Sequence, residues 1–213
     1  TNSPDLRGID VALLYQRDLF KLLSSRSISI PPLKQYRPTR DLLHVSGLLL
    51  TGDTLDVFVC HLPSRSGGAK ESESYRLYAA HILRMEVDSI MSIRSLPQVI
   101  IMGDFNDYPT NQSIQKILEA EAPPVTTNNL ASTTGSTNFS TVAPSSLKLY
   151  HLLARKAKSK DFGSYKYRGE WGLLDHLIVS GTLLNQSNHF FTSEEKANVC
   201  LLPFLLKDDE KYG

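Results

Sequence analysis

The sequence is poor in the features that define several common classes of protein. Its 213 residues include two cysteines, Cys60 and Cys200, too few for a disulfide framework or a zinc-binding cysteine pattern. No apolar run is long enough to cross a bilayer as a helix, so we expect no membrane insertion. Basic and acidic residues number 23 and 22. The resulting net charge of +1 excludes a global positive field, so phosphate-rich partners would have to be drawn by local patches.

The remaining composition is that of a globular domain. Hydrophobic residues make up 41% and charged residues 21% of the chain. This length is sufficient for one domain with its own core, and we predict a single domain over residues 1–213. Residues 123–146 are rich in Thr, Ser, Asn and Pro and have little periodicity, which predicts a long surface loop or a flexible insert.

Hydrophobic periodicity predicts strands and helices along the chain. Helices are predicted at residues 71–94, 111–120 and 147–157. Strands are predicted at residues 8–15, 41–50, 54–61, 98–102, 162–168 and 173–180. Because the strands arrive as meandering pairs with few helices between them, we predict an α+β fold rather than a wound parallel sheet.

Polar side chains gather at the ends of three predicted strands. His61 follows the apolar residues 55–60, Asp104 and Asn106 follow the strand at 98–102, and Asp175 lies within residues 173–180. Singly, each has a structural explanation, because strand-end histidines often only make a hydrogen bond and strand-end aspartates often close a turn. Together they would line one rim of a folded domain.

This set of groups suits the hydrolysis of a phosphate ester. A hard cation such as Mg²⁺ takes one or two carboxylates from the protein. Asp104 could orient or deprotonate the attacking water, and Asn106 could hold that water or a phosphate oxygen. His61 could donate to a non-bridging oxygen, and Arg65 could clamp phosphate through its planar guanidinium.

One basic stretch, residues 155–168, contains interleaved aromatic residues. Its cations could neutralise the phosphates of a nucleic acid while Tyr165 or Tyr167 stacks on a base. A solvated helix end followed by a half-buried aromatic strand would give the same pattern, so both interpretations stay open.

The motifs resemble a known superfamily when they are taken in chain order. His61-Leu-Pro-Ser-Arg65, Gly103-Asp-Phe-Asn106 and Leu174-Asp-His176 look like the endonuclease/exonuclease/phosphatase superfamily. Residues 3–15 and 63–68 are similar to its bacterial, nuclease-like branch. The resemblance covers at least residues 3–180 and implies a four-layer α/β/β/α sandwich with two mostly antiparallel sheets. Because that branch is often exported, it also implies a periplasmic or extracellular location, which the residues themselves leave open.

The resemblance also assigns roles to individual residues. It implies that His61 contacts phosphate, that Asp104 and Asn106 activate and position the nucleophile, and that Asp175 supports a catalytic histidine. Arg7 and Arg65 become candidates for substrate contact, with a structural salt bridge as the alternative for each.

The implied cofactor is Mg²⁺ (or Mn²⁺), and Asp104 is its one candidate ligand in this chain. The family's principal metal-binding Glu precedes the segment that residues 3–15 resemble, and its catalytic histidine follows the point where this chain stops. We therefore expect a domain that is incomplete at both ends and lacks its N-terminal strands and its C-terminal strand. By itself it should bind Mg²⁺ weakly and show no turnover. A homodimer could cover the sheet edge that such a loss exposes.

For the complete protein, the sequence favours a metal-dependent phosphodiesterase, most simply a nuclease. Residues 61–65 do not match the patterns of the inositol phosphatases or sphingomyelinases, so a phosphatase of small phosphorylated substrates ranks lower. A member of the same fold that binds a phosphorylated ligand or a partner without cleaving it is the alternative from another class.

Overall fold

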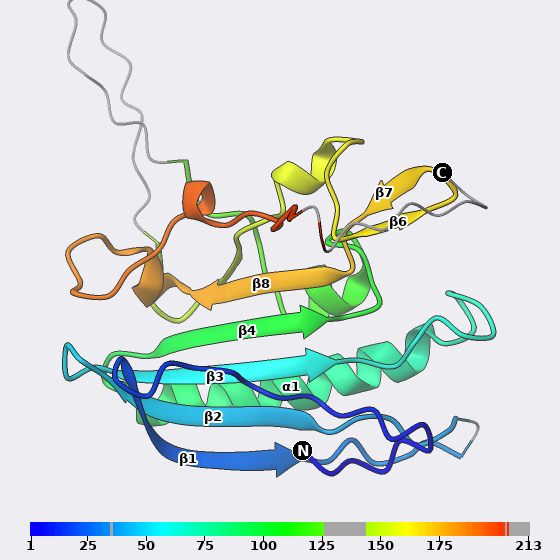
Figure 1. The fold of residues 1–213 in the computed structure, drawn as a ribbon, viewed down its shortest axis with the longest axis horizontal. Helices are drawn as coiled ribbons and strands as arrows, with labels where there is room; N and C mark the ends of the chain where they lie inside the picture. Colours follow the sequence, from blue (N-terminus) through cyan, green and yellow to red (C-terminus); the bar gives the residue numbers. More distant parts are fainter. Residues whose placement is uncertain (35, 126–143, 203, 205–213) are drawn as a thin grey trace, which may run out of the picture.

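A computed structural model describes residues 1–34, 36–125, 144–202 and 204 of the chain (Figure 1). Its main element is a six-stranded sheet with the strand order β1-β2-β3-β4-β8-β5. These strands are β1 (Phe20–Ile28), β2 (Leu42–Leu49), β3 (Thr54–His61), β4 (Gln98–Asp104), β8 (Asp175–Ser180) and β5 (Leu149–His151). A second, two-stranded sheet pairs β6 (Tyr165–Tyr167) with β7 (Glu170–Gly172). The helical elements are α1 (Glu73–Ile93) and the short turns η1 (Ser113–Ile117), η2 (Lys156–Lys158), η3 (Gly181–Leu184) and η4 (Glu194–Lys196).

Most neighbouring strands run antiparallel. The exception is the pair β3 and β4, which α1 connects in a crossover and which is therefore parallel. The predicted α+β class with two mostly antiparallel sheets is confirmed. A four-layer sandwich has two helical layers and two sheets. The described residues form one helical layer and one large sheet, and their second sheet is the β6–β7 hairpin.

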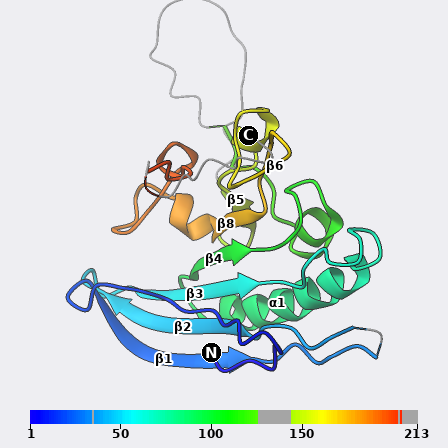
Figure 2. The same cartoon turned by 45° about the vertical axis from the view of Figure 1, so that its right-hand side comes forward.

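The main core lies between α1 and one face of the large sheet (Figure 1 and Figure 2). The apolar side of α1 presents Ala79, Leu83 and Val87 at helical spacing, and all three are fully buried. They belong to the same cluster as Phe58 of β3 and Ile101 of β4. The periodicity of residues 71–94 thus predicted both the helix and its buried face.

The opposite face of the sheet carries a second apolar cluster that includes Val45, Val57 and Val179. Residues 9–19 cross this face as an irregular segment, in front of the strands and on the side away from α1 (Figure 1), and Leu13 packs against the cluster. The strand predicted at residues 8–15 is therefore wrong. A short apolar run predicts burial, but it does not say whether a neighbouring strand offers its backbone for pairing.

Three other predictions need correction. Residues 147–157 form the short strand β5 and the turn η2 rather than a helix, because residues 149–151 pair with β8. The helix predicted at residues 111–120 contracts to η1. The aromatic strand predicted at residues 162–168 contracts to β6, and its two tyrosines are exposed rather than half-buried. The centre of the predicted insert, residues 126–143, lies outside the described residues.

Two described strands, β1 and β7, lie in segments for which no element was predicted. Strand β1 lies at an edge of the large sheet, and seven of its nine residues are exposed, so its sequence lacks the alternation of a half-buried strand. A homodimer that covers a sheet edge stays a prediction. No helix in the described part of the chain is both long and apolar enough to span a membrane.

Candidate active site at the ends of β3, β4 and β8

Three of the predicted site residues form one row across neighbouring strands. His61 is opposite Asp104 in the β3–β4 ladder, and Asp104 is opposite Asp175 in the β4–β8 ladder. Strands β3 and β4 end at this row, whereas β8 begins there because it runs antiparallel to β4. Side chains at opposed positions of neighbouring strands lie on the same face. The structure therefore brings an imidazole and two carboxylates together at one end of the sheet, with His61 Nε2 3.5 Å from Asp104 Oδ2.

Asn106 is fixed beside this row by the turn that follows β4. Its backbone has a positive φ of 52°, a conformation that Asn tolerates better than most residues. Its backbone N–H donates to Asp104 Oδ1 at 2.7 Å, and its Nδ2 donates to the carbonyl oxygen of Leu62 at 3.0 Å. Gly103 is required just before, because a Cβ there would lie 2.0 Å from the carbonyl oxygen of Cys60. The turn thus places a carboxamide next to the carboxylate.

The environment of Asp104 favours its protonated form. Burial is the largest influence and raises the pKa of Asp104 above its ordinary value, and the negative charge of Asp175 raises it further. The hydrogen bond from the Asn106 backbone and the charge of Arg40 act in the opposite direction without cancelling the increase. A carboxylate with a raised pKa is better suited to accept a proton near neutral pH.

The environment of His61 favours its neutral form. Burial lowers the pKa of His61, and the positive charges of Arg40 and Arg7 lower it further, while the negative charges of Asp5 and Asp175 oppose the change. Near neutral pH the ring is thus a neutral imidazole with one N–H to donate.

Sequence reasoning missed two buried residues behind the row, Arg40 and Asp5. Arg40 Nη1 donates to Asp5 Oδ2 at 3.1 Å, and Arg40 Nη2 donates to the carbonyl oxygen of Leu62 at 2.6 Å. That carbonyl also accepts the Asn106 amide. A buried arginine before a strand produces no periodic pattern in the sequence. The only signal was that two arginines, Arg37 and Arg40, lie within four residues of each other and had no assigned role.

The two predicted phosphate-contacting arginines have different surroundings. Arg7 donates from Nε and Nη2 to the Asp5 carboxylate, at 3.2 and 3.0 Å, yet 56% of its side chain remains exposed. The guanidinium of Arg65 lies over the Tyr108 ring, 4.9 Å from the centroid. Arg7 thus makes the structural salt bridge that was its alternative interpretation, and it also keeps an accessible face.

Tyr165 and Tyr167 lie on the separate β6–β7 hairpin rather than in the row. Both side chains are exposed, and their rings are nearly parallel, with centroids 6.1 Å apart and an interplanar angle of 12°. Their predicted role in stacking on a base stays a prediction.

His176 follows Asp175 but points to the opposite face of β8. It is buried, its Nδ1 is hydrogen-bonded to Nε2 of His151, and its Nε2 lies 2.8 Å from the carbonyl oxygen of Asp107. Burial lowers the pKa of His176 to about 4. A neutral, fully packed imidazole of this kind holds the loop after β4 against β8.

Asp107 anchors the same loop to α1. Its carboxylate accepts Nε of the buried Arg76 at 2.7 Å and the Ser113 hydroxyl at 2.7 Å. Arg76 also donates to the Ser72 hydroxyl and to the carbonyl oxygen of Ala69. Asp107, the residue directly after the Gly103-Asp-Phe-Asn106 motif, therefore has structural partners rather than a place in the row.

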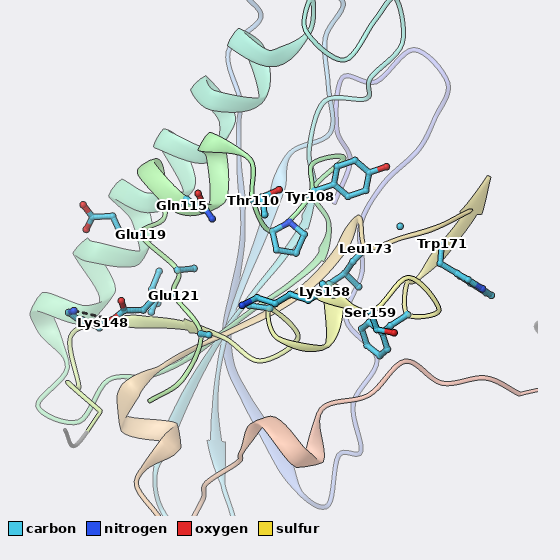
Figure 3. Close-up of a pocket in the computed structure, with 18 of the residues that line it drawn as sticks. Tyr108, Thr110, Gln115, Glu119, Glu121, Lys148, Lys158, Ser159, Trp171 and Leu173 are labelled. Carbon is cyan, nitrogen blue, oxygen red and sulfur yellow. Dashed lines mark hydrogen bonds and ion pairs between the residues drawn. The ribbon is translucent and has the colours of Figure 1, made fainter. Parts of the chain in front are cut away.

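A cavity of about 970 Å³ is lined by none of the four site residues (Figure 3). Its lining includes Tyr108, two residues after Asn106, and Leu173, two residues before Asp175. Figure 3 shows the Lys158 side chain lying across the centre of the view, below Thr110 and to the left of Leu173, while Trp171 lies at one side on β7. The cavity offers aromatic, aliphatic and cationic surface.

The fit of a metal ion can be judged from the residues present. The described part of the chain holds no group of three or more His, Cys, Asp or Glu side chains that could bind a metal. Asp104 and Asp175 nevertheless supply the hard oxygen atoms that Mg²⁺ prefers, and Mg²⁺ usually takes only one or two carboxylates. The charge of Asp175 raises the pKa of Asp104, and a cation between them would relieve this repulsion. The two residues therefore fit part of a Mg²⁺ site.

Comparison with family models adds to this geometry. The model described as the endonuclease/exonuclease/phosphatase family matches residues 1–213. The chain belongs to this family. A comparison with curated protein sequences finds no match.

Solved structures similar to this family member come from several organisms. The human Nocturnin catalytic domain with bound sulfate is 20% identical, with a TM-score of 0.50 and coverage of 78% of this chain and 50% of that one. A mannosyl-6-phosphatase from Bacteroides thetaiotaomicron is 16% identical, with a TM-score of 0.51 and coverage of 78% and 55%. Caenorhabditis elegans TDP2 is 14% identical, with a TM-score of 0.49 and coverage of 77% and 54%. The chain spans about half the length of these structures, and at such identities the likeness shows the fold alone.

Proposed function

We propose that the full-length protein is a metal-dependent phosphoester hydrolase that acts on phosphodiesters, with nucleic acid as the favoured substrate. The observation that carries this proposal is the row of His61, Asp104 and Asp175 across three adjacent strands, with Asn106 held against Asp104. Family membership supports phosphoester chemistry in general. The preference for diesters over monoesters rests on the arginine and tyrosine side chains that are assigned to substrate contact below.

In this proposal Asp104 orients the attacking water and takes its proton, which its raised pKa favours. The neutral His61 donates its N–H to a non-bridging phosphoryl oxygen, where negative charge develops. One N–H of the Asn106 amide is used in its bond to Leu62. Among the described residues nothing else contacts the amide, so its carbonyl oxygen and second N–H are available to hold the water or a phosphate oxygen.

The proposed cofactor is Mg²⁺ or Mn²⁺, with Asp104 as the ligand that this chain supplies and Asp175 beside it. When bound, such an ion would neutralise charge on the phosphoryl oxygens and help to lower the pKa of the attacking water. Arg7 and Arg65 would contact the phosphates of the substrate, and Tyr165 or Tyr167 would stack on a base next to the basic residues 155–168.

A second candidate function, a phosphatase of small phosphorylated substrates, is favoured by the cavity that Tyr108 and Leu173 line. Its volume of about 970 Å³ falls in the range of small-molecule sites. The mixed aromatic and cationic surface of Tyr108, Trp171 and Lys158 would accept the organic part of a phosphorylated metabolite. The two candidates differ in whether one or two ester bonds join the phosphate to the substrate.

The deciding experiment compares three substrates with the full-length protein: bis-p-nitrophenyl phosphate, p-nitrophenyl phosphate and a single-stranded oligonucleotide. We expect hydrolysis of the diester and the oligonucleotide in Mg²⁺ or Mn²⁺, and its loss when EDTA removes the metal. Hydrolysis of the monoester alone would replace the first candidate by the second. Failure with all three substrates, together with retained phosphate binding, would leave the non-catalytic alternative.

The pH dependence of activity tests the coupling between the two carboxylates. Since Asp104 must be ionised to act as a base, kcat/KM should rise as pH rises through the raised pKa of Asp104. The charge of Asp175 contributes to that increase, so Asp175→Asn should lower the pKa of Asp104. We therefore expect the acid limb of the pH–rate profile to move to lower pH in this variant.

The control for this measurement is Asp18→Asn, which removes the charge of an exposed carboxylate in a turn before β1. Its acid limb should coincide with that of the wild type. An acid limb that stays in place or moves to higher pH in Asp175→Asn would refute the coupling, whatever happens to the maximal rate.

A further inference from the structure

A second pocket, of about 440 Å³, opens beside the row, and of the residues that line it the proposal above uses only Arg7. Three loops form it, at residues 5–7, 36–40 and 63–67, together with Ser72 and Tyr75 at the start of α1. In Figure 1 these loops lie at the same end of the sheet as the tips of β3 and β4. We call it the arginine pocket, because Arg7, Arg37 and Arg40 all line it.

The arginine pocket is continuous with the proposed active site through the segment that follows β3. Leu62 comes directly after His61 and directly before Pro63, which lines the pocket. The carbonyl oxygen of Leu62 accepts hydrogen bonds from both Arg40 and Asn106. A ligand in this pocket would thus be separated from the row by little more than this peptide unit.

The charge of the pocket is positive. Asp5 is the only acidic residue that lines it in the described part of the chain, against three arginines. Hydrogen bonds from Arg7 and Arg40 hold the pKa of Asp5 well below its usual range, so this carboxylate stays ionised and is shared by two guanidinium groups. Arg37 is exposed and makes no ion pair with any described residue. Two positive charges are left in excess.

Three buried polar atoms of the lining have no partner. Thr39 Oγ1, Arg40 Nε and Tyr75 Oη are shielded from solvent, and none makes a hydrogen bond to any described residue. A buried N–H or hydroxyl without a partner is unfavourable, and an N–H needs an acceptor. An anion with several oxygen atoms would supply acceptors for such groups and for the nearby guanidinium groups.

The start of α1 adds to the same preference. This helix has 21 residues, and its N-cap, Ser72, lines the pocket. The N-terminus of a long helix carries a partial positive charge and favours anions. The net positive charge, the polar groups without partners and the position of the helix N-terminus therefore all favour an anionic ligand.

We propose that the arginine pocket binds a second phosphate group of the substrate, with Arg37, Arg40 and Thr39 as its contacts. This inference rests on the proposed phosphodiester hydrolysis and makes it more specific. The preferred substrates are phosphoesters that carry another phosphate next to the scissile one, such as a nucleic acid end with a terminal phosphate. A substrate that lacks the second phosphate leaves the pocket unused.

The kinetic test compares two dinucleotides, one with a 5′-phosphate and one with a 5′-hydroxyl, and reports the ratio of their kcat/KM values in the full-length protein. We expect the wild type to prefer the phosphorylated dinucleotide. Arg37→Gln should reduce that ratio by about tenfold because a charge-assisted contact is lost, and Thr39→Val should reduce it less. Arg17→Gln removes a charge from an exposed turn outside the pocket and should leave the ratio unchanged.

A binding test makes the inference independent of turnover. Calorimetric titration with inorganic pyrophosphate, in EDTA, should show binding to the wild type and to Arg17→Gln, and binding about tenfold weaker to Arg37→Gln. Circular dichroism would establish that each variant is folded. Arg40 is not replaced, because its loss would leave the buried Asp5 carboxylate without its buried guanidinium partner.

The outcomes separate the two proposals. If both dinucleotides are cleaved but Arg37→Gln keeps the wild-type ratio and the wild-type pyrophosphate affinity, the second-phosphate pocket is refuted and the hydrolase stands. If neither dinucleotide is cleaved but pyrophosphate binding depends on Arg37, the pocket is supported as a phosphate site and the hydrolase is refuted.

Discussion

Replacing Asp104 by alanine in the full-length protein should lower kcat for phosphodiester hydrolysis by about three orders of magnitude. The substitution removes the proposed base and also the acceptor of the hydrogen bond from the Asn106 backbone, which is 2.7 Å long. The water would then lose both its proton acceptor and part of its positioning. Steady-state rates with bis-p-nitrophenyl phosphate in Mg²⁺ would measure the effect.

Asp104→Asn and Asp18→Ala complete this experiment. The asparagine variant keeps the shape and an acceptor oxygen, so a comparable loss of rate would assign the effect to the base rather than to the turn. Asp18 is an exposed acid outside the site, and its replacement should leave the rate within about twofold of the wild type, as expected for a surface change. A loss below about tenfold for Asp104→Ala would exclude it as the general base.

Replacing Asp107 by alanine should lower the free energy of unfolding by about 3–5 kcal/mol. The change leaves the fully buried Arg76 guanidinium without its carboxylate and frees the Ser113 hydroxyl from its acceptor. The remaining bonds of Arg76, to Ser72 and Ala69, are to neutral groups and cannot compensate a buried charge. Chemical denaturation followed by circular dichroism would give the free energies of unfolding of the wild type and of the variant.

The matched control is Asp88→Ala, which removes the carboxylate partner of Arg84 on the exposed side of α1. An exposed i,i+4 pair contributes about 0.3–0.5 kcal/mol, so the control should be nearly as stable as the wild type. If Asp107→Ala costs less than about 1 kcal/mol, water or another group replaces the carboxylate and the buried pair is not what holds the loop. A destabilised loop should also reduce activity, because Asn106 precedes Asp107 directly.

The parts of the fold that the sequence predicted are those with strong local patterns. Strand β3 was predicted with its observed bounds, and β2 and α1 were predicted to within about two residues at each end, the usual uncertainty of boundaries. In α1 the buried apolar residues repeat at helical spacing, whereas β2 and β3 are short apolar segments with consecutive residues buried on both faces. Residues 8–15 and 147–157 were misassigned because an apolar run without a clear period does not define the element, and in residues 8–15 it did not define burial either, since Val11 is buried but Leu14 is 96% exposed.

The same distinction applies to the candidate site. His61, Asp104, Asn106 and Asp175 could be named from the sequence because each follows or begins an apolar strand and matches a family motif. Arg40 and Asp5 could not, because a buried arginine is stable only next to a carboxylate 35 residues away in the chain, and no local pattern encodes that contact. The arginine pocket was missed for the same reason, since three separate loops form it.

By itself the sequence determined which segments bury an apolar face and which polar residues stand at their ends, because side-chain periodicity is a local property of the chain. Only the tertiary structure decided that β8 runs antiparallel to β4, so that Asp175 at its start meets Asp104 at the end of β4. It also decided that Arg40 is buried beside them. Strand order and the pairing of buried charges depend on contacts between segments that are distant in the sequence. The free energy of such a contact depends on both segments together, so neither segment alone encodes it.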